Sequence, residues 1–142
     1  MNQQVIAFVG KNQIFLHDIF IYDTDEPSNC EVWKRLPIFL QDFITTKHII
    51  LRNVVFDFLK PSGLKPVFTS GFRSPVVNKN VGGVSDSLHL HGLALDFIPL
   101  SQCNVIKLDK NLEEQFKKLP IKDNYTLIFE NTHYHIQFKR GV

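Results

Sequence analysis

The sequence has few cysteines, no long apolar stretch and no large excess of either charge. Cys30 and Cys103 are the only two cysteines among 142 residues, and their separation matches no metal-binding spacing. A disulfide between them is one possibility, but two buried thiols are the more ordinary outcome. No apolar run approaches the roughly 18–20 residues that span a membrane. The sequence therefore favours neither a disulfide scaffold nor an integral membrane protein.

The first residues also lack the features of a signal peptide. MNQQVIAFVGKNQ has no basic region followed by an apolar region and a small-residue cleavage site. We therefore expect synthesis in the cytoplasm, so that action outside the cell would require release by another factor. The net charge is only +2, the lysines are scattered, and no aromatic-basic motif stands out, so we expect no specific nucleic-acid partner.

The composition is that of one globular domain with an ample core. Hydrophobic residues make up 44% of the chain and include 13 phenylalanines, and we find no repeat or low-complexity segment. We expect a single domain over 1–142 and, in the absence of any contrary indication, a monomer.

The pattern of apolar residues and turn formers predicts an α+β domain, with a small, mainly antiparallel β-sheet and helices on one side. The central strand should be 93–98, because it is almost wholly apolar. The other expected elements are a hairpin at 5–16, a loop at 23–31, a short helix opened by Pro37, helices at 46–59 and 108–119, a turn with a helical turn at 73–80, and strands at 66–70, 125–129 and 134–138.

Asp96 is out of place in this apolar strand. A buried carboxylate must be paired, neutralised or bound to a cation, and for a lone aspartate a salt bridge or exposure at a strand edge is the usual solution. His89 changes that balance, because Gly92 allows a turn that brings His89 beside Asp96. Imidazole and carboxylate are both suitable ligands for zinc. His91 is a further candidate, which we expect near the rim.

A second histidine cluster lies near the end of the chain. His133 and His135 are two residues apart, so on a strand they face the same side. One of them would complete a three-ligand zinc site with an open position for water, although two solvated rings on an exposed strand would give the same pattern. Glu130 is a plausible general base for that water.

Arg73 is the candidate for binding negative charge. It follows Ser70-Gly71-Phe72 and precedes Ser74-Pro75. Its guanidinium would hold a substrate carboxylate or a developing oxyanion, whereas the alternatives are a surface arginine or a structural ion pair.

These segments, in this order, resemble the zinc D-alanyl-D-alanine carboxypeptidase and dipeptidase superfamily, which includes phage L-alanyl-D-glutamate endolysins and the amino-terminal domain of Hedgehog. The pattern Ser87-x-His89-x-x-Gly92-x-Ala94-x-Asp96 matches the first metal motif of that group at each fixed position. The segment 70–75, with Asn78 and 81–83, is similar to the stretch that precedes it in compact members. The resemblance covers 46–138, the expected catalytic core, while 1–45 match only weakly.

The resemblance implies that His89, Asp96 and His135 bind zinc, because Tyr134-His135-Ile136 fits the strand frame of the last ligand. Glu130 would be the base, although it lies three residues before His133 and five before His135. This spacing departs from the dipeptidase branch and is closer to Hedgehog. His133 would then either support the metal ligands or contact the transition state, and Ser87 would orient the substrate or a ligand.

The resemblance implies a zinc-dependent peptidase that hydrolyses an amide bond in bacterial peptidoglycan. The setting it suggests is phage-encoded degradation of the cell wall, either in an infected host or as a virion component. A zinc-bearing module that binds the wall or a protein without turnover is the alternative, since Hedgehog uses this fold for recognition.

Overall fold

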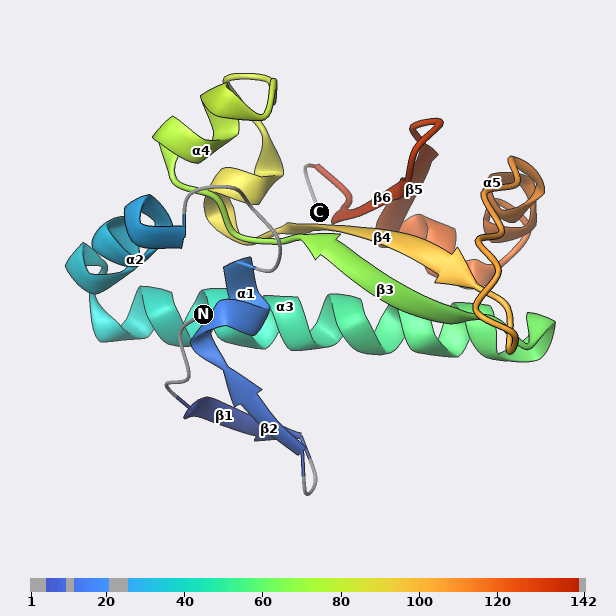
Figure 1. Cartoon of the computed structure of the whole chain (residues 1–142), viewed down its shortest axis with the longest axis horizontal. Helices are drawn as coiled ribbons and strands as arrows, with labels where there is room; N and C mark the ends of the chain where they lie inside the picture. Colours follow the sequence, from blue (N-terminus) through green and yellow to red (C-terminus); the bar gives the residue numbers. More distant parts are fainter. Residues whose placement is uncertain (1–4, 10–11, 21–25, 141–142) are drawn as a thin grey trace.

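The computed structural model describes residues 5–9, 12–20 and 26–140. Figure 1 shows a long helix, α3, running beneath a sheet, with shorter helices at both ends. The strands are β1 (Val5–Val9), β2 (Asn12–Phe15), β3 (Lys65–Ser70), β4 (Ala94–Leu100), β5 (Tyr125–Phe129) and β6 (Tyr134–Phe138). The helices are α1 (Leu16–Phe20), α2 (Glu26–Arg35), α3 (Ile38–Leu59), α4 (Pro75–Asn80) and α5 (Asn111–Phe116), with 3₁₀ turns η1 (Lys60–Ser62), η2 (Leu88–His91) and η3 (Pro120–Asp123).

Four strands form the main sheet in the order β3-β4-β6-β5, and every neighbouring pair is antiparallel. The inner strands β4 and β6 pair Asp96 with His135 and Ala94 with Gln137. Because successive side chains of a strand point to opposite faces, Leu95 and Phe97 lie on one face and Asp96 lies on the other. The predicted α+β class and the central position of the apolar strand are confirmed.

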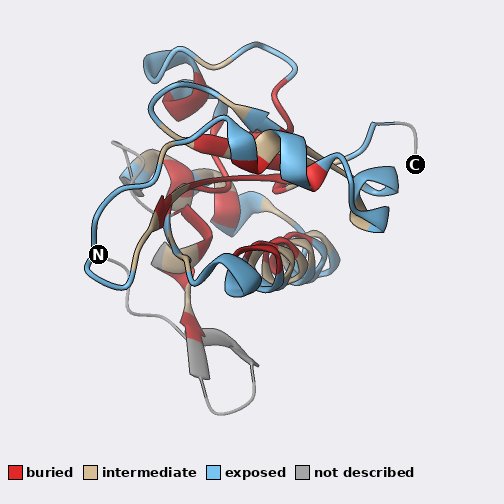
Figure 2. Cartoon of the chain, turned by 90° about the vertical axis from the view of Figure 1, so that its right-hand side faces the viewer, coloured by how far each residue is buried: buried red, intermediate tan, exposed pale blue. Residues whose placement is uncertain are grey.

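The core lies between the sheet and the helices α3 and α5. Helix α3 is buried along one side and exposed along the other, which Figure 2 shows in red and blue. Burial of this apolar stripe is the main driving force for a helix of this length. The buried core comprises Leu51, Val55, Phe58, Leu59, Phe68, Leu95, Phe97, Leu112, Phe116, Leu127, Tyr134 and Ile136.

The amino-terminal part has a second apolar cluster that reaches the loop after β3. Phe20, Trp33 and Phe72 form an aromatic trio with ring centroids 5.8–6.2 Å apart. Ile44 joins this cluster from the start of α3. Described residues of β2, α1, α2 and the start of α3 are therefore packed against the same loop that carries Arg73.

The hairpin over 5–16 is confirmed by antiparallel pairing of β1 with β2, and its turn at residues 10–11 lies outside the described residues. The loop predicted at 23–31 is wrong from residue 26 onward, because α2 begins there. Although the sequence of α2 is largely polar, the helix has a buried side: Asn29 and Trp33, four residues apart, are both buried. Residues 23–25 lie outside the described part.

The short helix expected after Pro37 and the helix expected at 46–59 form a single helix, because α3 runs without a break from Ile38 to Leu59. Polar residues in its middle find partners within the helix: Thr45 Oγ1 donates to the Gln41 carbonyl, and Arg52 Nε donates to His48 Nε2 at 2.7 Å. Helix α5 is shorter than predicted. None of the described helices combines the length and apolar character needed to cross a membrane.

The two cysteines are not bonded to each other in this structure. Cys30 is half-buried on α2, but Cys103 is exposed in the loop after β4. The expectation of two buried thiols is therefore wrong for Cys103, because the turn that carries it lies on the surface.

Candidate metal centre

His89 is fixed by the short turn η2. Ser87 Oγ accepts a hydrogen bond from the His89 backbone N–H at 3.2 Å, which caps the start of the turn. Gly92 ends it in the left-handed region, at φ +69°, and a Cβ there would lie 2.4 Å from Ile44 Cγ2. Only glycine meets both demands without strain. The chain therefore enters β4 directly after presenting His89, and His91 points to the surface and is exposed.

The loop after β3 sets the orientation of the His89 ring. His89 Nδ1 lies 2.7 Å from the Gly71 carbonyl oxygen, which can only accept, so Nδ1 carries a proton and Nε2 is the nitrogen turned toward Asp96. This loop is held from behind by α1: the N–H groups of Gly71 and Phe72 donate to the carbonyls of Phe20 and Ile19.

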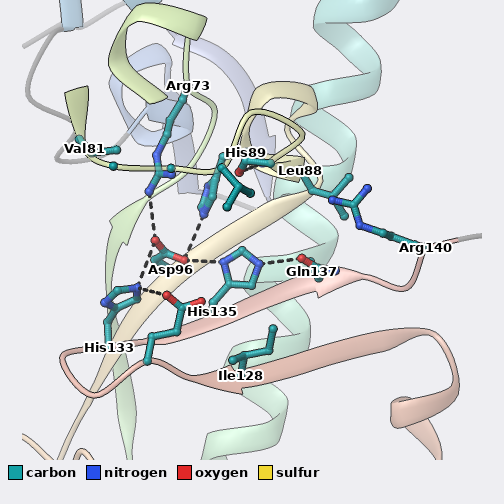
Figure 3. Close-up of a pocket in the computed structure, with 15 residues that line it drawn as sticks. Arg73, Val81, Leu88, His89, Asp96, Ile128, His133, His135, Gln137 and Arg140 are labelled. Atoms are coloured by element: carbon teal, nitrogen blue, oxygen red, sulfur yellow. Dashed lines mark hydrogen bonds and ion pairs between the residues drawn. The ribbon is translucent and has the colours of Figure 1, made fainter. Parts of the chain in front are cut away.

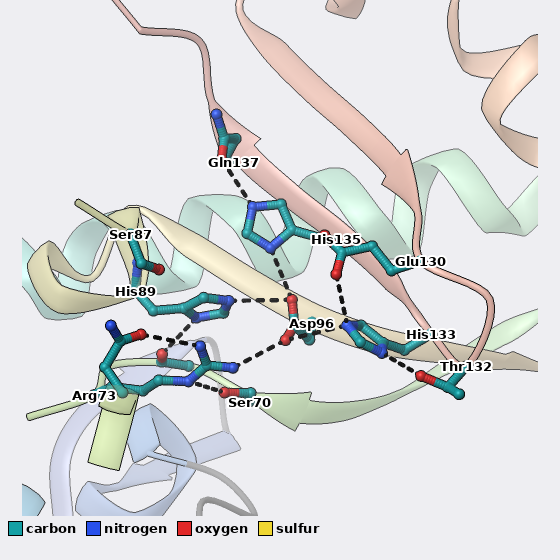
Figure 4. A network of polar contacts seen from close by, with 12 residues as sticks. Ser70, Arg73, Ser87, His89, Asp96, Glu130, Thr132, His133, His135 and Gln137 are labelled. Atoms are coloured by element: carbon teal, nitrogen blue, oxygen red, sulfur yellow. Dashed lines mark hydrogen bonds and ion pairs between the residues drawn. The ribbon is translucent and has the colours of Figure 1, made fainter. Parts of the chain in front are cut away.

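Asp96 and His135 complete a cluster with His89 on the face of the sheet opposite α3. Asp96 Oδ1 lies 3.1 Å from His89 Nε2 and 2.9 Å from His135 Nδ1. The other nitrogen of His135, Nε2, lies 2.8 Å from Gln137 Oε1. Figure 4 shows these contacts as one network across β4 and β6. The two histidines thus turn different ring nitrogens toward the same carboxylate.

This donor set fits a divalent cation. One candidate ligand atom from each of His89, Asp96 and His135 lies within 4.8 Å of the others. Because Gly71 and Gln137 accept from the outer nitrogens, the inner nitrogens of both rings are the ones turned toward Asp96. With a cation bound, these nitrogens would offer it their lone pairs; without one, they can donate hydrogen bonds to the Asp96 carboxylate. The three side chains are buried or nearly so, and a positive ion at their meeting point would compensate the charge of Asp96.

The second oxygen of Asp96 faces Arg73. Arg73 Nη2 lies 3.3 Å from Asp96 Oδ2, while its Nε donates to Ser70 Oγ at 2.9 Å and its Nη1 to Asn78 Oδ1 at 3.4 Å. The side chain is buried. From the sequence, Arg73 could bind substrate or form a structural ion pair. In the structure it forms an ion pair with Asp96.

Electrostatic effects on the cluster oppose one another. Burial raises the pKa of Asp96, but hydrogen bonds and charge interactions with His135 and His89 outweigh it, so its pKa lies well below the ordinary value. Burial lowers the pKa of His135, yet Asp96 and Gln137 more than compensate and leave it raised. The carboxylate of Asp96 is therefore ionised throughout the neutral range, as a metal ligand must be.

His133 and Glu130 stand beside the cluster on the turn between β5 and β6. His133 Nε2 lies 3.6 Å from Asp96 Oδ2 and 3.6 Å from Glu130 Oε2, and its Nδ1 contacts Thr132 Oγ1 at 2.9 Å. The Glu130 N–H donates to the His133 carbonyl, which closes the turn. Glu130 is 45% exposed, so its carboxylate is open to water.

These residues line one cavity of about 350 Å³, drawn in Figure 3. Apolar side chains from the loop after α4 and from β5 form part of its wall, among them Val81, Val84 and Ile128. Ser87 lines the cavity while its hydroxyl caps η2. Sequence reasoning missed Gln137 and Arg140. The alternation of β6 places Gln137 on the face of His135 and could have revealed it, whereas no local pattern marks Arg140.

The fold and this cluster define an α+β domain with a candidate His/Asp/His metal centre on the open face of its sheet. Residues 44–137 match the Peptidase M15 family, and the chain belongs to that family of metallopeptidases. Its expected substrate class is therefore a peptide. No curated protein and no solved structure gives a significant match to the chain.

Proposed function

We propose that the protein is a zinc-dependent peptidase that hydrolyses an amide bond of bacterial peptidoglycan peptides. The observation that carries the proposal is the convergence of His89 Nε2, Asp96 Oδ1 and His135 Nδ1 on one point at the edge of a cavity. Three protein ligands with an accessible side are the pattern of a catalytic rather than a structural zinc site. Membership of the M15 family supports the same reaction class.

A zinc ion held there would polarise the scissile carbonyl and lower the pKa of a coordinated water to about 7. Glu130 is the proposed general base. Its carboxylate is exposed to the cavity, so it would take the proton of the attacking water and deliver it to the leaving amine. Glu130 Oε2 lies 3.6 Å from His133 Nε2, next to the three candidate ligands, and Glu130 is not one of them.

His133 and Arg73 would stabilise the negative charge that develops on the carbonyl oxygen. Both have a nitrogen within 3.6 Å of Asp96 Oδ2, so each lies next to the metal position without belonging to the three ligands. Preorganised donors of this kind contribute most when charge appears in a partly buried site. Ser87, at the rim of the same cavity, would help to orient the peptide.

The biological setting is proposed by resemblance to compact phage peptidases: degradation of the cell wall of an infected host, or of the wall at entry as a virion component. The protein would then reach its substrate through lysis or through the virion. The bond cut would be an L-alanyl-D-glutamate, D-alanyl-D-alanine or cross-bridge amide.

The test is digestion of purified peptidoglycan with mass-spectrometric mapping of the fragments. Zinc-loaded protein should release new amine termini, a chelator should stop the release, and added zinc should restore it. Glu130→Gln should retain zinc and lose turnover, whereas Glu31→Gln, an exposed change on α2, should behave as wild type. One bound zinc with no amide cut would favour the alternative, a binding module on the same fold. Turnover that survives Glu130→Gln would exclude Glu130 as the base.

A further inference from the structure

A second cavity adjoins the one beside the candidate metal centre. Leu88 and Arg140 line both cavities, and Figure 3 shows the two residues at one end of the metal-site cavity. The second cavity has a volume of about 330 Å³ and lies between the first half of α3 and the end of β6. None of the three candidate ligands lines it, so its composition calls for a separate explanation.

The wall of this second cavity combines apolar and cationic side chains. None of the described residues that line it is acidic. The apolar ones come from α3, η2, the start of β4 and the end of β6, and the cationic ones from α3 and the residues after β6. We call this cavity the basic pocket; it is lined by Phe43, Lys47, Leu88, Leu93, Phe138, Lys139 and Arg140.

The positive charge of the basic pocket is poorly compensated by the protein itself. Lys47 Nζ lies 5.3 Å from the ring centroid of Phe43 and 4.9 Å from that of Phe138, so two aromatic faces hold the ammonium in place. Within the described part of the chain, neither Lys47 nor Lys139 forms an ion pair with a carboxylate. Arg140 has only Asp86, at 3.9 Å and 79% exposed, which makes a weak, screened pair. An anion would therefore supply the missing counter-charge.

An exposed apolar stripe leads from the basic pocket along α3. Phe39 lies one helical turn before Phe43, so the two rings lie on the same side of the helix, and they are 70% and 45% exposed. Ile38, next to Phe39, is 74% exposed. The carboxylate of Asp42 is turned about 100° around the helix axis from Phe43. Neighbouring exposed apolar side chains of this size mark an interaction surface.

We propose that the basic pocket and the stripe formed by Phe39 and Phe43 are a docking site for anionic lipid. The headgroup phosphate would lie among the three cations, and an acyl chain would lie against the two rings. A ligand with its charge at one end and an apolar body at the other satisfies both parts of the surface, as in proteins that bind the face of a membrane through basic and aromatic residues. An acidic peptide, with charge along its length, would leave the rings in water.

This inference goes beyond the proposed peptidase function and does not depend on it. Because the two cavities share part of their wall, a lipid-bound protein would hold the metal-site cavity close to the membrane surface. The docking site would thus bring the protein to substrate that lies next to a membrane.

The experiment is co-sedimentation of the zinc-loaded protein with vesicles. One set consists of phosphatidylcholine alone, and the other of phosphatidylcholine and phosphatidylglycerol in equal parts. The variants are Lys47→Gln, Lys139→Gln and Phe39→Ser, and thermal unfolding checks that each is folded. Lys65→Gln on β3 and Val105→Ser in the loop after β4 are matched controls, because both residues are exposed and lie outside the basic pocket.

Wild type should bind the mixed vesicles and leave the neutral ones, and added salt should weaken the binding. Lys47→Gln and Lys139→Gln should each lower the partition coefficient roughly fivefold. Phe39→Ser should lower it roughly tenfold, whereas the two controls should match wild type. No binding, equal binding to both kinds of vesicle, or equal losses in variants and controls would overturn the inference. Equally strong retention on immobilised poly-L-glutamate, unaffected by Phe39→Ser, would assign the pocket to an acidic peptide and refute the lipid site.

Discussion

Gln137 Oε1 lies 2.8 Å from Nε2 of His135, on the opposite edge of the imidazole from Asp96. Its cross-strand partner is Ala94, whose small side chain leaves room beside it. An amide oxygen in this position keeps the proton on Nε2 and the lone pair on Nδ1, so Gln137 determines which nitrogen of His135 faces the metal position.

Replacement of Gln137 by leucine should therefore weaken zinc binding by roughly tenfold to a hundredfold, because the ring loses the acceptor that orients it. Competition with a chromophoric chelator measures this change directly. Gln137→Glu, which keeps an acceptor, should retain affinity, and Gln102→Leu on the exposed surface is the control. Unchanged affinity of Gln137→Leu would show that strand geometry alone orients His135.

The two late histidines should separate in their effects. His135→Ala should abolish stoichiometric zinc binding, because it removes one of three clustered donors. His133→Ala should keep the zinc and lower kcat by roughly a hundredfold, as expected for loss of a donor that acts on developing charge. Metal analysis after gel filtration, together with turnover, distinguishes the two. The reverse outcome would make His133 the ligand.

Gly92 and Gly82 offer a matched pair of substitutions. Both have positive φ, but a Cβ at Gly82 meets nothing within 4 Å, whereas a Cβ at Gly92 meets Ile44. Gly82→Ala should cost about 1 kcal/mol of unfolding free energy from its backbone conformation alone. Gly92→Ala should cost about 2–4 kcal/mol, since overpacking adds to that strain.

Urea unfolding with chelator present measures both changes without a contribution from bound metal. If the two alanine variants lost equal stability, the close approach of Gly92 to Ile44 would have no energetic weight.

His48 should give the folded protein a specific sensitivity to mild acid. Burial, and then the positive charge of Arg52, lower the pKa of His48 well below its ordinary value. The folded state therefore keeps His48 neutral, while the unfolded chain binds a proton below about pH 6.5. Because the unfolded state takes up more protons, stability falls as the pH decreases below about 6.5.

His48→Gln, which keeps an acceptor for Arg52, should lose that part of the pH dependence. Thermal unfolding of both proteins at pH 7 and pH 5 provides the comparison, and His91→Gln on the surface should retain the wild-type dependence. Identical pH profiles for wild type and His48→Gln would assign the acid sensitivity to other groups.

The parts of the fold that sequence predicted best are those with local causes. The strands at 125–129 and 134–138 agree with β5 and β6 because apolar residues and flanking turns define them on their own. Helix α2 escaped prediction because its sequence is largely polar: of its described residues, Asn29 and Trp33 are the buried ones, and Asn29 is itself polar. Its helical state depends on packing against segments far along the chain, which overrides local propensity.

The same distinction applies to the site. The approach of His89 to Asp96 could be predicted, because the two residues are only seven apart in the sequence and Gly92 allows a turn between them. The contact of Arg73 with Asp96 depends on the β3–β4 register, which places Ser70 opposite Asp96. The position of Arg140 depends on a hydrogen bond to Asp86 across 54 residues. Such long-range relationships follow from tertiary packing and leave no periodic trace in the sequence.

Gly71 is bonded on both sides: its N–H binds the Phe20 carbonyl, and its own carbonyl binds His89. Phe20 lies before the stretch that matches the family, and His89 lies inside it. A chain shortened to 44–137 would thus retain every candidate ligand and lose the support that aims one of them. Substitutions in the amino-terminal segment would accordingly change metal affinity without altering a candidate ligand. Related proteins with identical metal motifs could differ in metal affinity through this segment.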